Sequence, residues 1–211
     1  MNAFAVLQQV AAQVADCERC MLHHSRKRAV PGDGPPDAEL MFIGEGPGFH
    51  ENEQGLPFVG AAGKFLDELL ASIGQQRRQV FITNVVKCRP PGNRDPQSDE
   101  LQACDDFLQR QIEAINPKVI ITLGRFSMQR FLPNAKISQV HGKAVRVNGR
   151  LVCPMYHPAA ALHQPSLRSS VEADFAALPG LIAQADAAPD FTAAAPEKNS
   201  GGQDPEQLSL F

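Results

Sequence analysis

The stretch LMFIGEGPG, residues 40–48, decides the fold class, because four apolar residues run straight into a turn of glycine, proline and one glutamate. A short apolar run closed by such a turn is typical of a buried strand that leads into a helix. The turn continues through FHENEQGLPFVG, residues 49–60. The apolar spacing that follows predicts an amphipathic helix over 61–73, ended by Gly74. A strand–turn–helix unit therefore begins the domain.

Strands and helices alternate along the rest of the chain. VFITNVV (80–86) and VIITLG (119–124) are β-branched runs, separated by a helix that we expect Ser98 to cap and that runs to about residue 115. A first helix covers about residues 4–16, AVRV (144–147) and RLVCPMY (150–156) form a hairpin around Asn148-Gly149, and a last helix covers 166–185. This alternation predicts an α/β fold, with a central, mainly parallel sheet and helices on both faces.

Composition limits the class of protein. The 211 residues, 43% of them hydrophobic, suffice for one good-sized core, and from residue 187 alanine, proline, glycine and charge predict a disordered tail. A net charge of -3 argues against a general polyanion binder but allows a local basic patch. No targeting segment and no apolar run of membrane-spanning length is present, so we expect a cytoplasmic protein with no membrane partner.

Three polar features fall at predicted strand ends, where ligands of such sheets bind. They are the turn at 44–48, Asn84 and His157. Each alone has an ordinary structural explanation, but together they predict one pocket. The turn lacks the lysine of a P-loop and the spacing of a dinucleotide fingerprint, and its acidic residues oppose a phosphate. We therefore expect a flat, neutral ligand.

The cysteines form a second group. Cys17 and Cys20 make a Cys-x-x-Cys pair, Cys88 and Cys104 stand alone, and Cys153 lies inside a predicted strand. Four thiols in a cytoplasmic protein suit zinc or an iron–sulfur cluster better than disulfides. A single close pair favours a cluster over zinc, and unliganded core thiols are a third interpretation that fits Cys153.

Three long segments carry a family resemblance. They are GEGPGFHENEQGLPFVGAAGKFLDELL (44–70), ITNVVKCRPPGNRDP (82–96) and YHPAAAL (156–162). In this order, and with the four cysteines, they closely resemble the family-four uracil-DNA glycosylases over about residues 17–178. The resemblance implies the uracil-DNA glycosylase fold over residues 1–185 and a [4Fe–4S] cluster held by Cys17, Cys20, Cys88 and Cys104.

The resemblance also assigns the pocket to uracil, which must be flipped out of the DNA to be read and cut. Phe58 would stack on the base, and the bare backbone at Glu45 and Gly46 would reach its carbonyl oxygens. Asn84 can satisfy O4 and N3–H of uracil and mismatches cytosine. Glu51 is expected to face C5, where thymine carries its methyl group.

The chemistry expected of such a site is cleavage of the N-glycosidic bond, which leaves a uracil anion. His157 is the residue expected to stabilise charge on O2. The related family-one enzymes have an aspartate at the position of Gly46, so Glu45 or a water held by backbone groups is the expected substitute for water activation. The expected function is a DNA-repair glycosylase that flips deoxyuridine, hydrolyses the bond and leaves an abasic site.

Two alternative functions stay open. One alternative is a covalently trapping relative, although no arginine-rich insertion lies between Leu123 and His141. The other is a non-catalytic iron–sulfur module that binds nucleic acid.

Contacts with DNA are expected beside the pocket. The residues expected to hold uracil-containing DNA are Lys87, Arg89, Arg94, Leu162 and His163.

The chain ends in QDPEQLSLF, which places bulky apolar residues after a predicted disordered linker, residues 186–206. Residues 207–211 resemble the pentapeptide with which bacterial repair proteins bind the sliding clamp. The resemblance implies a bacterial, monomeric, nucleoid-associated protein recruited to newly replicated DNA. The residues expected to bind the clamp are Gln207, Leu208, Leu210 and Phe211.

Overall fold

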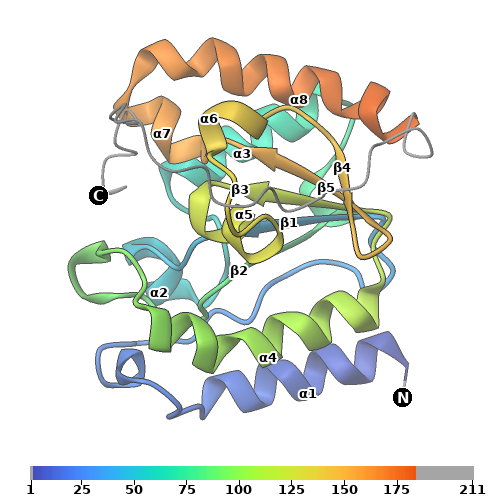
Figure 1. The fold of residues 1–211 in the computed structure, drawn as a ribbon. Helices are drawn as coiled ribbons and strands as arrows, with labels where there is room; N and C mark the ends of the chain where they lie inside the picture. Colours follow the sequence, from blue (N-terminus) through green and yellow to red (C-terminus); the bar gives the residue numbers. More distant parts are fainter. Residues whose placement is uncertain (1, 184–211) are drawn as a thin grey trace.

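A computed structural model describes residues 2–183 of the chain, which form one five-stranded sheet between two layers of helices (Figure 1). The spatial order of the strands is β2-β1-β3-β5-β4, and every neighbouring pair is parallel except β4 and β5. The prediction of a mainly parallel α/β sheet is confirmed. The strands are β1 (Leu40–Gly44), β2 (Phe81–Asn84), β3 (Val119–Leu123), β4 (Val145–Val147) and β5 (Arg150–Met155).

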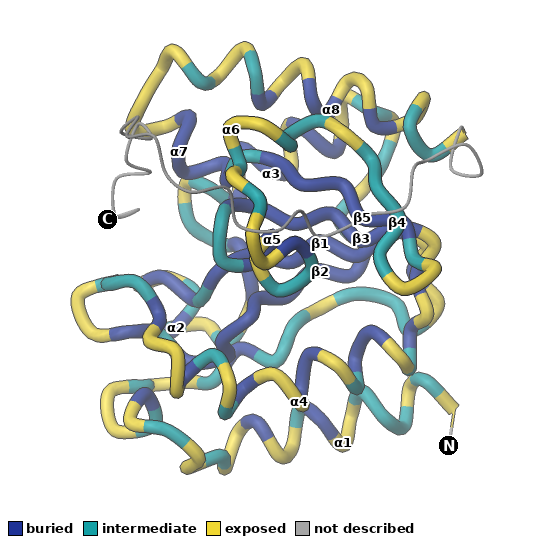
Figure 2. The backbone as a smooth tube through the Cα atoms, in the orientation of Figure 1, coloured by how far each residue is buried: buried dark blue, intermediate teal, exposed yellow. Residues whose placement is uncertain are grey.

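Each face of the sheet has its own layer of helices. Helices α3, α7 and α8 lie on one face, while α4 lies on the other with α1 packed against its outer side (Figure 1). The central strands are buried throughout, as Figure 2 shows. The helices are α1 (Ala3–Ala15), α2 (Phe49–Gln54), α3 (Ala61–Ser72), α4 (Ser98–Ile115), α5 (Arg125–Phe131), α6 (Ile137–Val140), α7 (Pro158–His163) and α8 (Arg168–Ala183).

The alternating faces of β1 explain this layering. Phe42 points into the core under α3 and α8, where its ring stacks on that of Phe175 with centroids 6.1 Å apart. Its neighbours Met41 and Ile43 pack in the opposite core, against residues of α4 such as Leu108. A strand buried on both faces needs an unbroken apolar run, which is why residues 40–44 are so informative about the fold.

Several boundaries differ from those predicted. Ser98 does not cap α4; it is the first helical residue, and the backbone N–H of Gln97 is bound by the carboxylate of Glu100 at 2.8 Å. Strand β2 ends at Asn84, two residues before the predicted end, although the next two backbone N–H groups still donate to the carbonyls of Gly44 and Glu45. The last helix begins at Arg168, after a 3-10 turn over Pro165–Leu167.

The hairpin between β4 and β5 turns at the predicted residues. Asn148 and Gly149 have φ values of 51° and 77°, as a type I′ turn requires. None of the helices between residues 2 and 183 is long and apolar enough to cross a membrane. The predicted linker and clamp-binding peptide, residues 186–206 and 207–211, lie outside the described residues.

Candidate active site

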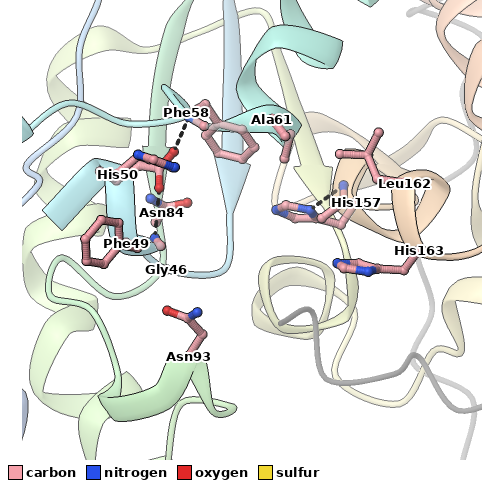
Figure 3. A pocket seen from close by; sticks show the side chains of 15 residues that line it. Gly46, Phe49, His50, Phe58, Ala61, Asn84, Asn93, His157, Leu162 and His163 are labelled. Carbon is pink, nitrogen blue, oxygen red and sulfur yellow. Dashed lines mark hydrogen bonds between the residues drawn. The ribbon is translucent and has the colours of Figure 1, made fainter. Parts of the chain in front are cut away.

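The carboxyl ends of three parallel strands meet around one cavity of about 370 Å³ (Figure 3). Gly44 of β1 pairs in register with Asn84 of β2, and His157 follows the end of β5 by two residues. Figure 3 shows Phe58 and Asn84 on one side and His157 opposite. The lining residues are Gly46, Gly48, Phe49, His50, Glu51, Phe58, Gly60, Ala61, Ala62, Asn84, Asn93, His157, Ala159, Leu162 and His163.

Phe58 is held in this cavity by a strained backbone. Its φ of 51° lies in the left-handed region, which a bulky residue adopts only when its surroundings enforce it. Arg77 supplies the restraint, since its guanidinium donates to the carbonyl of Phe58 at 3.0 Å and also to that of Pro57. Gly63 is required here because a Cβ at that position would lie 1.8 Å from the Phe58 oxygen.

The carboxylate of Glu51 fastens the same loop from inside. It accepts hydrogen bonds from the backbone N–H groups of Gly48 at 3.1 Å, Val59 at 2.8 Å and Gly60 at 2.9 Å. These bonds join the start of α2 to the residues that follow Phe58. Glu51 lines the cavity, and its expected position opposite C5 of a bound base stays a prediction.

Asn84 offers an unused acceptor to the cavity. Its side chain is 1% exposed, and its Oδ1 has no hydrogen-bond partner within the described part of the chain. A buried carbonyl left in this state costs about 1–3 kcal/mol, so a ligand that donates a hydrogen bond here recovers that free energy. The side chain of Asn84 can pack this closely against residue 44 only because that residue is glycine, since a Cβ there would lie 2.5 Å from the Asn84 Oδ1.

His157 presents a fixed donor. Its Nδ1 accepts the backbone N–H of Ala159 at 3.1 Å, so the ring proton must be on Nε2. Burial lowers the pKa of His157 to about 4, which keeps the imidazole neutral near pH 7. The ring lies 5.4 Å from that of Phe58 at an interplanar angle of 25°. A neutral imidazole beside an aromatic ring suits a flat ligand that accepts a hydrogen bond.

Glu45 does not line this cavity; it lines a small neighbouring pocket that shares Gly46, Asn93 and His157 with the cavity. Burial, with a smaller contribution from Asp95, raises its pKa to about 7, and Arg125 partly offsets the shift. Asp95 and Arg125 are themselves an ion pair. A carboxyl group with this pKa is half ionised at neutral pH, as a general base needs to be.

Lys87 corrects the expectation of a DNA contact. Lys87 is 1% exposed, and its side chain points into the protein. Its ammonium donates to Thr83 Oγ1 at 2.5 Å, to the carbonyl of Asn84 at 2.9 Å and to Gln111 Oε1 at 2.7 Å. Burial lowers the pKa of Lys87 to about 7. Lys87 therefore supports the strand end that carries Asn84 and does not reach DNA.

The four predicted cysteine ligands come together behind this strand end, with thiols that line one small cavity between α1 and α4. Cys104 Sγ accepts the backbone N–H of Lys87 at 3.3 Å, and Arg26 lies 3.7 Å from Cys88 Sγ. Among the described residues, no three Cys, His, Asp or Glu side chains are close enough to hold a single metal ion. Four thiols around one small cavity are a donor set of the kind that binds zinc or an iron–sulfur cluster. Cys153 lies apart from them, buried in β5.

Of the other predicted DNA-binding residues, Leu162 and His163 line the cavity, whereas Arg89 and Arg94 do not. Leu162 is 42% exposed on α7, beside His163. Arg94 makes two hydrogen bonds to the carboxylate of Glu100, so part of its charge is already used. Arg89 is half-buried and close to Phe49, an exposed residue that the sequence analysis missed.

Comparisons with known proteins point to one superfamily. A model of the uracil-DNA glycosylase superfamily matches residues 31–178. A type-4 uracil-DNA glycosylase of Saccharolobus solfataricus is 51% identical over 179 residues, which are 80% of this chain and 83% of the relative. One from Archaeoglobus fulgidus is 49% identical over 80% of this chain and 89% of its own, and one from Thermotoga maritima is 43% identical over 76% and 85%.

The chain belongs to the uracil-DNA glycosylase superfamily. Within that superfamily, the type-4 enzymes named above are similar to it over most of their own length.

Proposed function

We propose that this chain is a uracil-DNA glycosylase of the type-4 class, which takes deoxyuridine out of DNA and hydrolyses its N-glycosidic bond. The observation that carries the proposal is the buried Oδ1 of Asn84, which has no partner in the described part of the chain and lies across a cavity of about 370 Å³ from the Nε2–H of His157. Uracil has the complementary edge, since N3–H donates and O4 and O2 accept. Cytosine reverses the donor and acceptor at this edge and would leave Asn84 mismatched.

Binding uses the residues that are already in place. Phe58 stacks on the face of the flipped base, while Asn84 accepts from N3–H and donates to O4. The strained backbone of Phe58 is fixed before the base arrives, so little conformational entropy is lost on binding. Preorganisation of this kind favours recognition of a base that must first be unstacked.

Cleavage breaks the bond between C1′ and N1, and the electron pair leaves with uracil. The Nε2–H of His157 points at O2, where negative charge develops, and such a donor contributes about 3–4 kcal/mol in a dry site. A water attacks C1′ of the oxocarbenium-like sugar, and its proton passes to the carboxylate of Glu45. The products are uracil and an abasic site.

We propose that Cys17, Cys20, Cys88 and Cys104 hold a [4Fe–4S] cluster. When bound, the group would join α1 to α4 and would support the end of β2 as a structural element. Lys87 links the two sites, because its backbone N–H binds Cys104 and its ammonium holds the carbonyl of Asn84.

A uracil-containing oligonucleotide tests the proposed function. We expect incubation with the protein to release free uracil and to leave a strand that alkali cleaves. His157→Ala should reduce single-turnover excision by about a hundredfold or more and leave DNA affinity nearly unchanged. A covalent protein–DNA band would show a trapping protein instead, and DNA binding without product would show a non-catalytic module.

The end of the chain supports a proposal about recruitment. We propose that residues 207–211, QLSLF, bind the bacterial sliding clamp, with Gln207 at the pocket rim and Leu210 and Phe211 in an apolar cleft. This proposal rests on sequence alone, since these residues lie outside the described range. It would place the enzyme in the cytoplasm, on newly replicated DNA.

Deletion of residues 207–211 separates recruitment from catalysis. A peptide of residues 203–211 should bind purified bacterial clamp with a Kd of about a micromolar order. The truncated protein should lose clamp binding and keep full excision activity on short oligonucleotides. Equal clamp binding by the truncated and full-length proteins would refute the assignment.

A further inference from the structure

The lip of the uracil pocket carries an aromatic ring that the proposed reaction does not use. Phe49 begins α2, is 54% exposed and lines the same cavity as Asn84 and His157, but at its mouth (Figure 3). Among the described residues, five large hydrophobic side chains are notably exposed, and only Phe49 and Leu162 of these line the cavity. Exposed aromatic area at the edge of a ligand site is typical of a binding surface.

A cation accompanies this ring. The guanidinium carbon of Arg89 lies 5.4 Å from the centroid of Phe49, and its Nε is fixed by the side chain of Asn93. The ring of His50 also packs against that of Phe49, with centroids 5.4 Å apart and an interplanar angle of 83°. We call Phe49 and Arg89 the rim shelf. A supported ring with an adjacent guanidinium is the usual arrangement for stacking a single-stranded base.

We propose that the rim shelf binds the nucleotide next to the extruded uracil, with its base stacked on Phe49 and its phosphate facing Arg89. This inference rests on the proposed function, because it needs a flipped uracil in the cavity. With the extruded base in the cavity, the neighbouring nucleotide of the same strand lies outside it, at the lip where Phe49 is exposed. Contacts with flanking nucleotides often set the sequence context of enzymes that flip bases.

The charges around the lip indicate that base stacking contributes to the affinity for DNA at this face. The chain carries a net charge of -3, and two nearby arginines are engaged, Arg94 with Glu100 and Arg125 with Asp95. Phosphate attraction is therefore limited at this face. Stacking on an aromatic ring adds affinity for any neighbouring base, since every base has an apolar face.

Binding to a non-cleavable target isolates the contact. An oligonucleotide with 2′-fluoro-2′-deoxyuridine serves, because the fluorine opposes the oxocarbenium-like sugar. Phe49→Ala should weaken single-strand binding about tenfold, while Phe49→Tyr should retain it. The matched control is Phe4→Ala, which removes a ring of similar exposure, 56%, from α1 and should leave affinity unchanged.

Removing the neighbouring base tests the same contact from the DNA side. Two further oligonucleotides carry an abasic nucleotide on the 5′ or the 3′ side of the target. On one of them the wild type should bind as weakly as Phe49→Ala does, and Phe49→Ala should lose nothing more. Arg89→Gln should reduce the slope of log affinity against log salt by about 0.7, whereas Phe49→Ala should leave that slope unchanged.

Two results would overturn the inference. One is equal affinity of Phe49→Ala and wild type for the intact oligonucleotide; the other is additive losses from the variant and both abasic neighbours. The first result would mean that Phe49 serves another occupant, such as a partner protein, and the second that it contacts the DNA somewhere other than at the neighbouring base. A wild-type protein that excises no uracil would refute the proposed function instead, so the two failures are distinguishable.

Discussion

The proposed role of Asn84 depends on one buried oxygen. Its Oδ1 has no hydrogen-bond partner among residues 2–183, so the free energy of this atom would depend on the base that enters the cavity. A base with a donor at N3 satisfies it, and one with an acceptor there leaves two polar groups unpaired. Selectivity by an unpaired buried group is stronger than selectivity by shape alone.

Asn84→Asp is expected to erode this selectivity. An ionised carboxylate only accepts hydrogen bonds, so it no longer donates to O4 of uracil but can accept from the amino group of cytosine. The ratio of single-turnover excision rates on uracil and cytosine should fall about 10- to 100-fold. Asn93→Asp, at the rim of the same cavity, is the control and should leave the ratio unchanged. An unaltered ratio in Asn84→Asp would mean that backbone groups read the base.

The pH dependence of excision should report Glu45. A base must be ionised to accept a proton, so kcat/KM should rise as pH increases through about 7, the pKa that burial gives this carboxyl group. His157 titrates near 4 and should not contribute in that range. Glu45→Gln should be slower and lose the rise. A wild-type profile that is flat from about pH 6 to 8 would remove Glu45 from the reaction.

Much of the site could be predicted at this scale, and the exceptions have physical reasons. Asn84 and His157 could be placed because the carboxyl ends of parallel strands share one edge of the sheet. The burial of Lys87 could not be predicted, because a lysine in a polar, arginine-rich segment is usually exposed. In the structure its ammonium is bound inside the protein by Thr83 and Gln111. Phe49 was missed because exposure cannot be read from a turn sequence.

At the scale of elements, the loop between α2 and α3 is the part most dependent on distant contacts. Arg77 lies 19 residues after Phe58 in the sequence and also pairs with Asp67 at 3.2 Å. No local pattern predicts this contact or the left-handed backbone that it restrains. The short helices α2, α5, α6 and α7 escaped prediction for a related reason, since four to seven residues carry little periodic signal. The long, buried strands were predicted because burial on both faces leaves a continuous apolar run.

Arg77 should act on catalysis only through Phe58. Arg77→Gln frees the carbonyls of Pro57 and Phe58, so the strained backbone can relax and the ring should leave its stacking position. We expect excision to fall about tenfold, mainly through KM, and Arg77→Lys to restore it only in part because lysine cannot donate in a fork. Arg78→Gln, at the adjacent exposed position, is the control.

A double-mutant cycle distinguishes positioning from general stability. If Arg77 works through the aromatic ring, its effect should disappear once Phe58 is alanine, with a coupling of about 1 kcal/mol. Additive losses in the two variants would show that Arg77 only stabilises the fold. Thermal unfolding of each variant provides the independent measure of stability.

At the scale of the whole molecule, the sheet separates two sites that share one strand end. Asn84 closes β2 on the side of the uracil cavity, and Cys88 follows four residues later on the side of α1 and α4. The general α/β architecture followed from the alternation of strands and helices along the sequence. The meeting of Cys17 and Cys20 with Cys88 and Cys104 needed the tertiary packing of α1 on α4.

The cysteine site predicts a coloured protein. Anaerobically purified protein should contain about four irons per chain and absorb broadly in the visible range, as expected for four thiolates around one cluster. Cys104→Ser should lower the iron content and the melting temperature. Cys153→Ser, which changes a thiol outside the site, should keep the full iron content and colour. A colourless protein with stoichiometric zinc would contradict the assignment.

Helix α7 connects the surface of the molecule to the imidazole of His157. Its first turn donates the Ala159 N–H that selects the tautomer of His157, and its last turn carries Leu162 at the surface. A helix of six residues therefore connects the surface residue Leu162 to the backbone group that orients the imidazole. Displacements of about 1 Å change rates about a hundredfold in preorganised sites. A shift of this one helix would change the surface at Leu162 and the position of the His157 donor together.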